Sequence, residues 1–276
     1  MKAHSIISNT ISEEILHKGH LSIRFMMEGF SLLLEDKNYH PVVLNKFSTE
    51  GSMSLTSQLL ACEDWLQRHT LIDDFSGEVS IIHDSSPALF VPESLFSEKD
   101  ASLYLEPLVS IPTHEYVRQK EIKGRPVVLV CLVPGLISSL TEKFSGPVRI
   151  IPASEVMLSM AEQVNAADHQ RGFMLIEAQH GLLNILMIKE DGIVLSNQLT
   201  MSGKGDLVYH ILNAMQHLGF DRKNRPLFYA GLTYAEEMEN LQKYIKTLVP
   251  LAYHIFDIDK SSIPEHILLA EATRCG

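Results

Sequence analysis

Apolar runs lead into a glycine at two places in the chain, and apolar positions resume directly after it in both. The first run ends at Gly29 and continues over residues 30–34, and the second ends at Gly181 and continues over residues 182–188. Glycine readily adopts the positive φ that a tight hairpin turn requires. Each place therefore predicts two antiparallel strands joined at the glycine.

The similarity extends to the segments that follow. A third strand is expected over residues 41–47 and 192–199, and a helix begins shortly after Gly51 and Gly203, which lie 152 residues apart, as the two hairpin glycines do. The apolar positions of both helices keep this offset at the spacing of one buried face. They are Leu55, Leu59, Cys62 and Leu66 in the first helix, and Leu207, Ile211, Ala214 and Leu218 in the second. This agreement predicts an internal duplication.

The remaining pattern gives both halves the order β-β-β-α-β-α-β. The elements expected next are strands over 79–82 and 227–230, a helix over 235–245 and a strand over 251–256. The first half adds an extended segment over 88–91, a helix opened by a capping box at 97–100, strands over 115–122, 127–133 and 149–151, and helices over 135–144 and 156–164. Polar residues 165–172 end that pattern. We therefore expect two lobes, residues 1–166 (with 1–18 as an N-terminal extension) and 167–276, each a mixed sheet with helices on both faces.

The composition narrows the classes of protein that fit. The 276 residues are 45% apolar and 21% charged, which is enough to bury a sizeable core and excludes wholesale disorder. The net charge of −11 argues against a nucleic-acid groove or an anionic membrane surface as the main partner, because both require clustered cations.

Three further features favour a cytoplasmic protein without membrane insertion. The first twenty residues hold no apolar run of the kind a secretory signal needs, so we expect none. The longest nearly apolar stretch, residues 127–137, contains Pro134 and Gly135 and is shorter than the roughly 18 residues of a membrane span. The three cysteines are odd in number and far apart, which is typical of free thiols in a reducing compartment.

Two halves of this kind in tandem resemble the actin-like ATPase superfamily. The chain also resembles an uncharacterised bacterial family of unknown function assigned that fold, through residues 21–34 (LSIRFMMEGFSLLL) and the acidic-rich C-terminal half. The resemblance implies an α/β fold of two tandem ribonuclease-H-like (actin-like ATPase) lobes, each a mixed five-stranded sheet with helices. It covers about residues 21–256.

In active members of that superfamily, the first hairpin turn of each half binds phosphate through a motif of the type Asp-x-Gly-Thr. Backbone N–H groups of such a turn cradle phosphate, while the carboxylate holds Mg²⁺ or polarises water. In this chain the matching acidic positions hold Met27 and Gln179. Both catalytic carboxylates are therefore absent from the places that the resemblance assigns to them.

Two acids lie close to these turns in shifted positions, Glu28 and Glu177, and the simpler interpretation is that they are a turn acid and a strand-edge acid. The adenosine-binding turn of the superfamily is matched at Gly231, where one of its two glycines is present ahead of a helix. An ordinary strand-to-helix loop is the simpler interpretation of Gly231.

The candidate cofactor-binding residues of an inter-lobe nucleotide cleft are therefore Gly29, Glu177, Gly181 and Gly231. ATP and Mg²⁺ are the cofactors that this cleft would take. We otherwise expect no cofactor, no catalytic residue and no metal ligand.

Other candidate chemistry is weaker. The glycine-rich turn at residues 202–206 presents N–H groups to an anion, but Gln198 and Gly205 stand where a P-loop needs Gly and Ser or Thr, so a capped helix start is the simpler interpretation. The thirteen histidines lack the spacing of a metal site, and Cys131 in an apolar strand is typical of core packing.

These observations favour a degenerate, non-catalytic actin-like module that acts through protein–protein contacts with a partner the sequence does not identify. The alternative is an ATP-binding kinase or ATPase of the same superfamily with rearranged acidic residues. A small-molecule sensor that uses the cleft without chemistry is a third hypothesis. Assembly into a homo-oligomer stays open.

Overall fold

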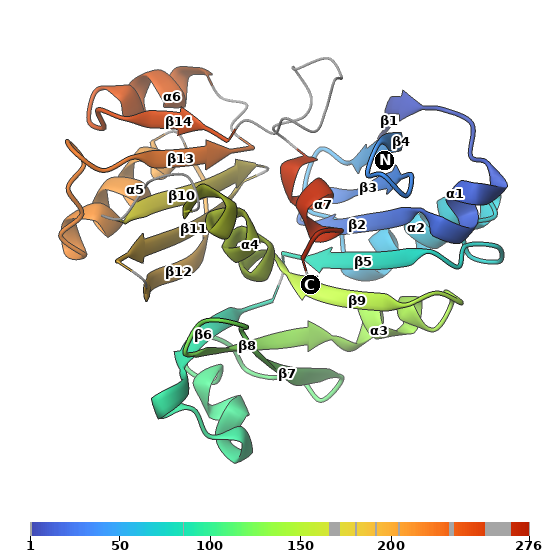
Figure 1. Ribbon diagram of the computed structural model, residues 1–276, viewed down its shortest axis with the longest axis horizontal. Coiled ribbons are helices and arrows are strands. Elements are labelled where there is room, and N and C mark those ends of the chain that lie inside the picture. The colour runs from blue at the N-terminus through green and yellow to red at the C-terminus, as the bar shows by residue number, and fades with distance from the viewer. Residues whose placement is uncertain are drawn as a thin grey trace.

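The computed structural model describes residues 2–84, 86–165, 172–179, 181–190, 192–203, 205–231, 235–251 and 266–275. Its strands form a six-stranded, a five-stranded and a three-stranded sheet. The two larger sheets lie next to each other with two helices between them, and the small sheet lies beyond one edge of the six-stranded sheet (Figure 1). This is the two-lobed α/β arrangement that the sequence predicted.

The first lobe is built on the six-stranded sheet, in the order β1-β4-β3-β2-β5-β9. Its strands are β1 (Lys2–Ser8), β2 (His20–Met26), β3 (Gly29–Glu35), β4 (Pro41–Ser48), β5 (Glu78–His83) and β9 (Val148–Pro152). Strands β2, β3 and β4 form the expected antiparallel meander. Strand β5 pairs in parallel with β2, and β9 pairs in parallel with β5.

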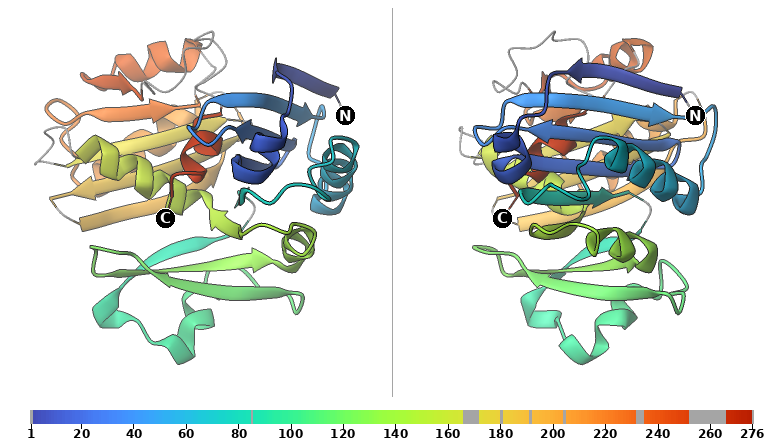
Figure 2. Two further views of the ribbon diagram at one scale, coloured as in Figure 1. Left: turned by 45° about the vertical axis from the view of Figure 1, so that its right-hand side comes forward. Right: turned by 90° about the vertical axis from the view of Figure 1, so that its right-hand side faces the viewer.

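The N-terminal segment contributes more than the predicted extension. Strand β1 pairs antiparallel with β4 and adds a sixth strand at the outer edge of the sheet, and the short helix α1 (Glu13–Lys18) follows it. Figure 2 shows β1 at one edge and the small sheet beyond the other. The hydrophobic pattern did not predict β1, because most of its side chains are exposed and an edge strand has little apolar surface to bury.

The second lobe repeats the arrangement of the first. Its sheet has the order β12-β11-β10-β13-β14, which corresponds strand for strand to β4-β3-β2-β5-β9. The strands are β10 (Phe173–Gln179), β11 (Leu182–Lys189), β12 (Gly192–Thr200), β13 (Leu227–Ala230) and β14 (Leu248–Pro250). The antiparallel and parallel pairs also correspond, as a duplication requires. Most of the strand expected over residues 251–256 lies outside the described residues.

The extra elements of the first half form the three-stranded sheet, β6 (Ala88–Pro92), β8 (Val127–Pro134) and β7 (Glu115–Glu121), all antiparallel. The helix expected after Ser97 is a 3₁₀ segment, η2 (Glu98–Tyr104), preceded by η1 (Glu93–Leu95). The Ser97 hydroxyl bonds the Asp100 carboxylate at 2.8 Å instead of capping a backbone N–H, so the capping box does not form.

Helices cover the outer face of each large sheet. Helices α2 (Leu55–Arg68) and α3 (Gly135–Thr141) lie on the first lobe, and α5 (Asp206–His217) and α6 (Ala235–Gln242) on the second. Leu59, Cys62 and Leu66 are buried as predicted for α2. In α5 the buried face shifts slightly, with Met215 buried and Ala214 and Leu218 partly buried.

The remaining two helices join the lobes. Helix α4 (Ala153–Asn165) follows the last strand of the first lobe and packs against β11 of the second, whereas α7 (Ile267–Ala272) near the C-terminus packs against β2, β3 and β5 of the first. Both helices lie between the two sheets (Figure 1) and belong to one hydrophobic core that includes residues of both lobes.

The predicted lobe boundary near residue 166 falls beside residues outside the described ranges and stays a prediction. No helix in the part of the chain that the structure describes is long and apolar enough to cross a membrane.

Candidate functional site

The predicted turn glycines occupy the hairpin positions that the sequence assigned to them. Gly29 begins β3 with φ 151°, and a Cβ there would lie 1.9 Å from the carbonyl oxygen of Phe47 in β4. Gly181 lies directly before β11 with φ 74°. No side chain fits at Gly29 without moving the neighbouring strand, so this glycine is required for packing as well as for the turn.

Two of the four candidate residues lie side by side. Glu177 in β10 pairs with Ala230 in β13, and Gly231 follows directly. A Cβ on Gly231 would lie 3.2 Å from Glu177 Oε1. Gly29, in contrast, packs against β4 of its own lobe.

The Glu177 carboxylate does not face an open cleft, because Arg24 from the first lobe holds it. Arg24 Nη1 donates to Glu177 Oε1 at 2.8 Å, and Nη2 donates to Oε2 at 3.1 Å. Arg24 Nε donates to Asp84 Oδ2 at 2.8 Å. Arg24, Asp84 and Glu177 are each at most 4% exposed. One guanidinium therefore bridges a carboxylate of its own lobe and a carboxylate of the other.

The sheet topology explains why these three residues meet. Strand β2 pairs in parallel with β5, so Arg24 lies near the carboxyl end of one and Asp84 directly follows the other. Glu177 lies near the carboxyl end of β10, beside the parallel strand β13. Open α/β sheets bind ligands at the carboxyl ends of their parallel strands, and the ion network occupies this position in both lobes.

Neutral side chains complete the hydrogen bonding of Glu177. Gln179 Nε2 donates to Oε1 at 2.7 Å, and Asn184 Nδ2 donates to Oε2 at 2.8 Å. Gln198 Nε2 donates in turn to Asn184 Oδ1 at 3.0 Å. Gln179, which stands where the resemblance placed a catalytic carboxylate, thus serves as a donor to another acid. With the two bonds from Arg24, each carboxylate oxygen of Glu177 accepts two hydrogen bonds.

The electrostatics of the network follow from its burial. Burial alone would lower the pKa of Arg24, but the charges of Asp84 and Glu177 outweigh it and raise that pKa, so the guanidinium stays charged. Burial raises the pKa of Asp84 to about 6, opposed by Arg24 and assisted by the negative charge of Glu177. The guanidinium of Arg24 therefore remains charged, and it interacts with the carboxyl groups of Asp84 and Glu177 at the same time.

The donor set does not fit Mg²⁺. Hard cations such as Mg²⁺ take oxygen ligands, preferably carboxylates. Met27 offers a thioether, and Gln179 is engaged with Glu177. The Glu177 oxygens are occupied by a guanidinium whose charge would repel a second cation. Among the residues that the structure describes, no cluster of three or more His, Cys, Asp or Glu could hold a metal ion.

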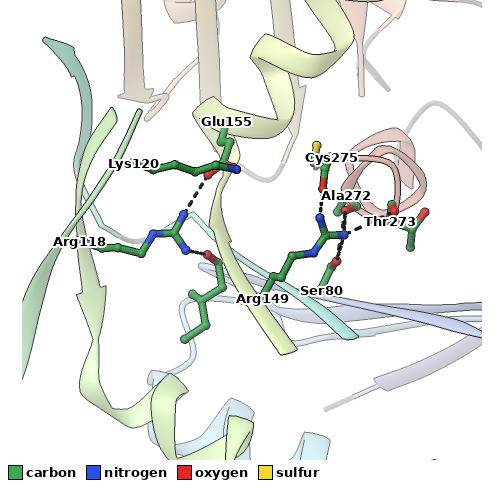
Figure 3. A network of polar contacts seen from close by, with 9 residues as sticks. Ser80, Arg118, Lys120, Arg149, Glu155, Ala272, Thr273 and Cys275 are labelled. Atoms are coloured by element: carbon green, nitrogen blue, oxygen red, sulfur yellow. Dashed lines mark hydrogen bonds and ion pairs between the residues drawn. The ribbon is translucent and has the colours of Figure 1, made fainter. Parts of the chain in front are cut away.

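A second set of polar contacts anchors the C-terminal helix to the first lobe. Arg149 in β9 donates to the backbone carbonyl groups of Ala272, Thr273 and Cys275 and to the Ser80 hydroxyl (Figure 3). A cation is favourable at a helix C-terminus, where carbonyl groups lack partners within the helix.

Three further hydrogen bonds strengthen the connection between the lobes. Ser159 and Gln163 of α4 both donate to Glu271 Oε1 of α7, at 2.6 and 2.7 Å. Thr273 Oγ1 donates to Glu35 Oε2 in β3 at 3.0 Å. The lobes are thus held together by the ion network and by α4 and α7, each of which packs against the sheet of the other lobe. We call this arrangement of α4 and α7 helix exchange.

A third group of contacts joins the small sheet to the first lobe. Arg118 and Lys120 of β7 both reach Glu155 at the start of α4, at 3.0 and 2.7 Å, and Arg118 also donates to the Ile150 carbonyl group (Figure 3). These cations lie beside a cavity of about 520 Å³ between β7 and β9.

Sequence reasoning missed Arg24, Asp84 and Asn184. A signal for Arg24 was present, because it is the one charged residue inside the apolar run that forms β2. A buried arginine needs a carboxylate partner. The partner in the other lobe lies 153 residues away, and no local pattern relates the two.

A family model described as "Protein of unknown function (DUF3822)" matches residues 8–248. The chain therefore belongs to this family. No curated protein matches it.

Solved structures share the fold at low sequence identity. A protein from Bacteroides thetaiotaomicron VPI-5482 with actin-like ATPase fold and unknown function is similar at TM-score 0.79 and 19% identity, over 97% of this chain and 100% of that one. A chain of the PilM-PilN type IV pilus biogenesis complex is similar at TM-score 0.65 and 13% identity, over 92% and 98%. The cytoplasmic domain of EpsL from Vibrio cholerae has TM-score 0.50 and 10% identity, over 94% and 96%. The actin-like fold expected from the sequence is confirmed.

Proposed function

We propose that this member of the DUF3822 family is a degenerate, non-catalytic actin-like module that acts through contacts with other proteins. The observation that carries the proposal is the bidentate pairing of Glu177 with Arg24. It neutralises, from within the chain, the acid that the sequence put forward for an inter-lobe nucleotide cleft.

Charge and hydrogen bonding both oppose nucleotide chemistry at this position. A metal ion that approached Glu177 would have to displace a buried guanidinium that donates three hydrogen bonds. Removing one partner of a buried ion pair typically costs about 3–5 kcal/mol. The exchange of α4 and α7 between the lobes also opposes the opening and closing that an enzyme cleft uses to admit substrate.

Surface features support the protein-contact part of the proposal. Three large apolar side chains in the segment between β6 and β7 are more than half exposed: Leu95, Leu103 and Leu108. Contiguous exposed apolar patches are typical of protein interaction sites, and we expect this segment to form one. A chain of similar fold is part of the PilM-PilN type IV pilus biogenesis complex, and we extend that mode of action to this protein by analogy of fold.

We place the module in the cytoplasm, with a protein as its partner and without a nucleic-acid partner. The net charge of −11 and the three buried free thiols support this assignment. Assembly with further copies of the chain is compatible with the same contacts.

The test is a thermal shift measurement with ATP and Mg²⁺. A ligand at about 100 times its Kd stabilises a protein by about 2.7 kcal/mol, which raises the Tm of a chain of this size by several degrees. We expect no such rise with ATP, ADP or their Mg²⁺ complexes. A reproducible Tm increase that depends on Mg²⁺ would contradict the proposal.

The second candidate is an ATP-binding kinase or ATPase of the superfamily with rearranged acids, Glu28 or Glu177. It is favoured by the adjacency of Glu177 and Gly231 at the carboxyl ends of two parallel strands. Under this candidate the wild type hydrolyses ATP and Glu177→Gln abolishes turnover. Under the proposal neither protein hydrolyses ATP. Measuring ATP hydrolysis by the wild type and by Glu177→Gln therefore separates the candidates.

A further inference from the structure

We propose that a cavity at the junction of β6, β12 and the start of α4 binds an uncharged small molecule that carries hydrogen-bond donors and acceptors beside an apolar part. The cavity has a volume of about 570 Å³, within the range of ordinary small-molecule sites. The proposal is independent of the proposed function, which concerns the ion network and protein contacts.

The three units of the molecule meet at this cavity. Leu89 comes from the small sheet, His83 and Ser154 come from the first lobe, and Asn184 and Gln198 come from the second. Ligand sites occur preferentially where structural units meet, because concave surfaces form there without disturbing either core.

The lining carries hydrogen-bonding groups but no permanent charge. Among the described residues that surround the cavity there is no Asp, Glu, Lys or Arg, and the polar side chains are serine hydroxyls, carboxamides and the imidazole of His83. Aliphatic and proline side chains supply the rest. A charged ligand would lose its hydration here without gaining a counter-ion, so the site selects neutral molecules.

Two of the polar side chains have hydrogen-bonding capacity that the described part of the chain does not use. His83 is 1% exposed, and neither of its ring nitrogens has a partner. The hydroxyl group of Ser154 is likewise buried without a partner. Buried polar groups are nearly always hydrogen-bonded, since leaving one unpaired costs about 1–3 kcal/mol. Both residues line the cavity, although these polar atoms have almost no surface open to solvent. A ligand that draws the two side chains toward it and pairs with them would recover this free energy.

The protonation state of His83 defines what the ligand must offer. Burial, assisted by the positive charge of Arg118, lowers the pKa of His83 to about 3, so the ring is neutral at physiological pH. A neutral imidazole presents one N–H donor and one nitrogen acceptor. An amide or a similar group with both functions complements it.

The cavity is separate from the predicted nucleotide residues but linked to the ion network. None of Gly29, Glu177, Gly181 and Gly231 lines it. Asn184, which does, donates to Glu177 and accepts from Gln198. A ligand that contacts the Asn184 carboxamide is therefore one hydrogen bond away from Glu177, whose pairing with Arg24 joins the lobes.

Three probes of the same size and different charge test the proposal on the full chain: benzamide, benzoate and benzamidine. We expect benzamide to shift the NMR methyl resonances of Met157 and Ile185, which line the cavity, with benzoate and benzamidine binding at least tenfold more weakly. Absence of any benzamide-induced shift, or equal binding of all three probes, would overturn the proposal.

Variants identify the site. Ser154→Ala should not lower Tm, because it removes a hydroxyl that is buried without a partner, while weakening benzamide binding several-fold. Ser138→Ala, whose hydroxyl bonds Tyr116 outside this cavity, is the matched control and should bind benzamide as the wild type does. Equal benzamide affinity in the wild type and in Ser154→Ala would also overturn the proposal.

Discussion

A charged side chain inside a buried strand must find partners, and Arg24 finds two. Its guanidinium joins Asp84 in its own lobe to Glu177 in the other. An internal ion pair therefore lies at the carboxyl ends of β2 and β10, each of which has a parallel neighbour in its own sheet. The acid at position 177 therefore contributes to the architecture of the lobe interface.

Replacement of Arg24 tests this role. Arg24→Met should lower the free energy of unfolding by about 3–5 kcal/mol, because it leaves two carboxylates buried without a cation. The measurement is urea unfolding at pH 7. The double variant Arg24→Met/Glu177→Gln removes one of the stranded charges and should recover part of the loss. A single variant as stable as the wild type would show that the network is not a structural contact.

At the scale of elements, local patterns predicted local structure well. The hairpin glycines, the meander strands and the helix at Leu55–Arg68 follow from periodicity over a few residues, because the groups involved are neighbours in sequence. Strand β1 and the exchange of α4 and α7 could not be found in this way. Their partners are distant in the chain, and in β1 the side chains themselves are mostly exposed.

The site was predictable only in part, for the same reason. Met27 and Gln179, at the positions where the resemblance places acids, are visible in the sequence, as are the turn glycines. The ion network of Arg24, Asp84 and Glu177 depends on contacts between the lobes, and the cavity depends on three units meeting. Neither leaves a pattern within a single segment.

The attachment of α7 to β3 makes the stability depend on pH. Burial raises the pKa of Glu35 to about 7, opposed by Arg274 and by the hydrogen bond from Thr273. In the unfolded chain the pKa is about 4.3. Between these values the folded state binds a proton that the unfolded state lacks, so stability falls as pH rises from about 4.5 to 7 and then levels off.

Glu35→Gln removes this ionisation. Its free energy of unfolding should decrease less than that of the wild type between pH 5 and pH 8, by about 1.4 kcal/mol for each pKa unit of the lost shift. Asp84, with its own raised pKa, supplies a remaining slope. Urea unfolding of the wild type and of Glu35→Gln across this pH range measures the contribution of Glu35 and the remaining slope. Glu50→Gln, at an exposed position, is the control. Parallel pH profiles for Glu35→Gln and the wild type would contradict the assignment.

At the scale of the whole molecule, helix exchange predicts that the two lobes unfold together. One hydrophobic core contains residues of both sheets and of both exchanged helices, and the ion network adds a second connection. Neither lobe can lose its exchanged helix without exposing the inner face of its own sheet. Equilibrium unfolding should therefore show one transition, in contrast to proteins whose domains are joined only by a linker.

The single tryptophan allows a direct measurement of this coupling. Trp65 lies in α2 of the first lobe and packs against Phe47, so its fluorescence reports on that lobe alone, whereas far-UV circular dichroism reports on both. We expect the two urea curves to coincide, because losing the inner core of one lobe removes the packing of the other. If the fluorescence midpoint differed from that of the circular dichroism, the lobes would be independent units, and the exchanged helices would not couple them.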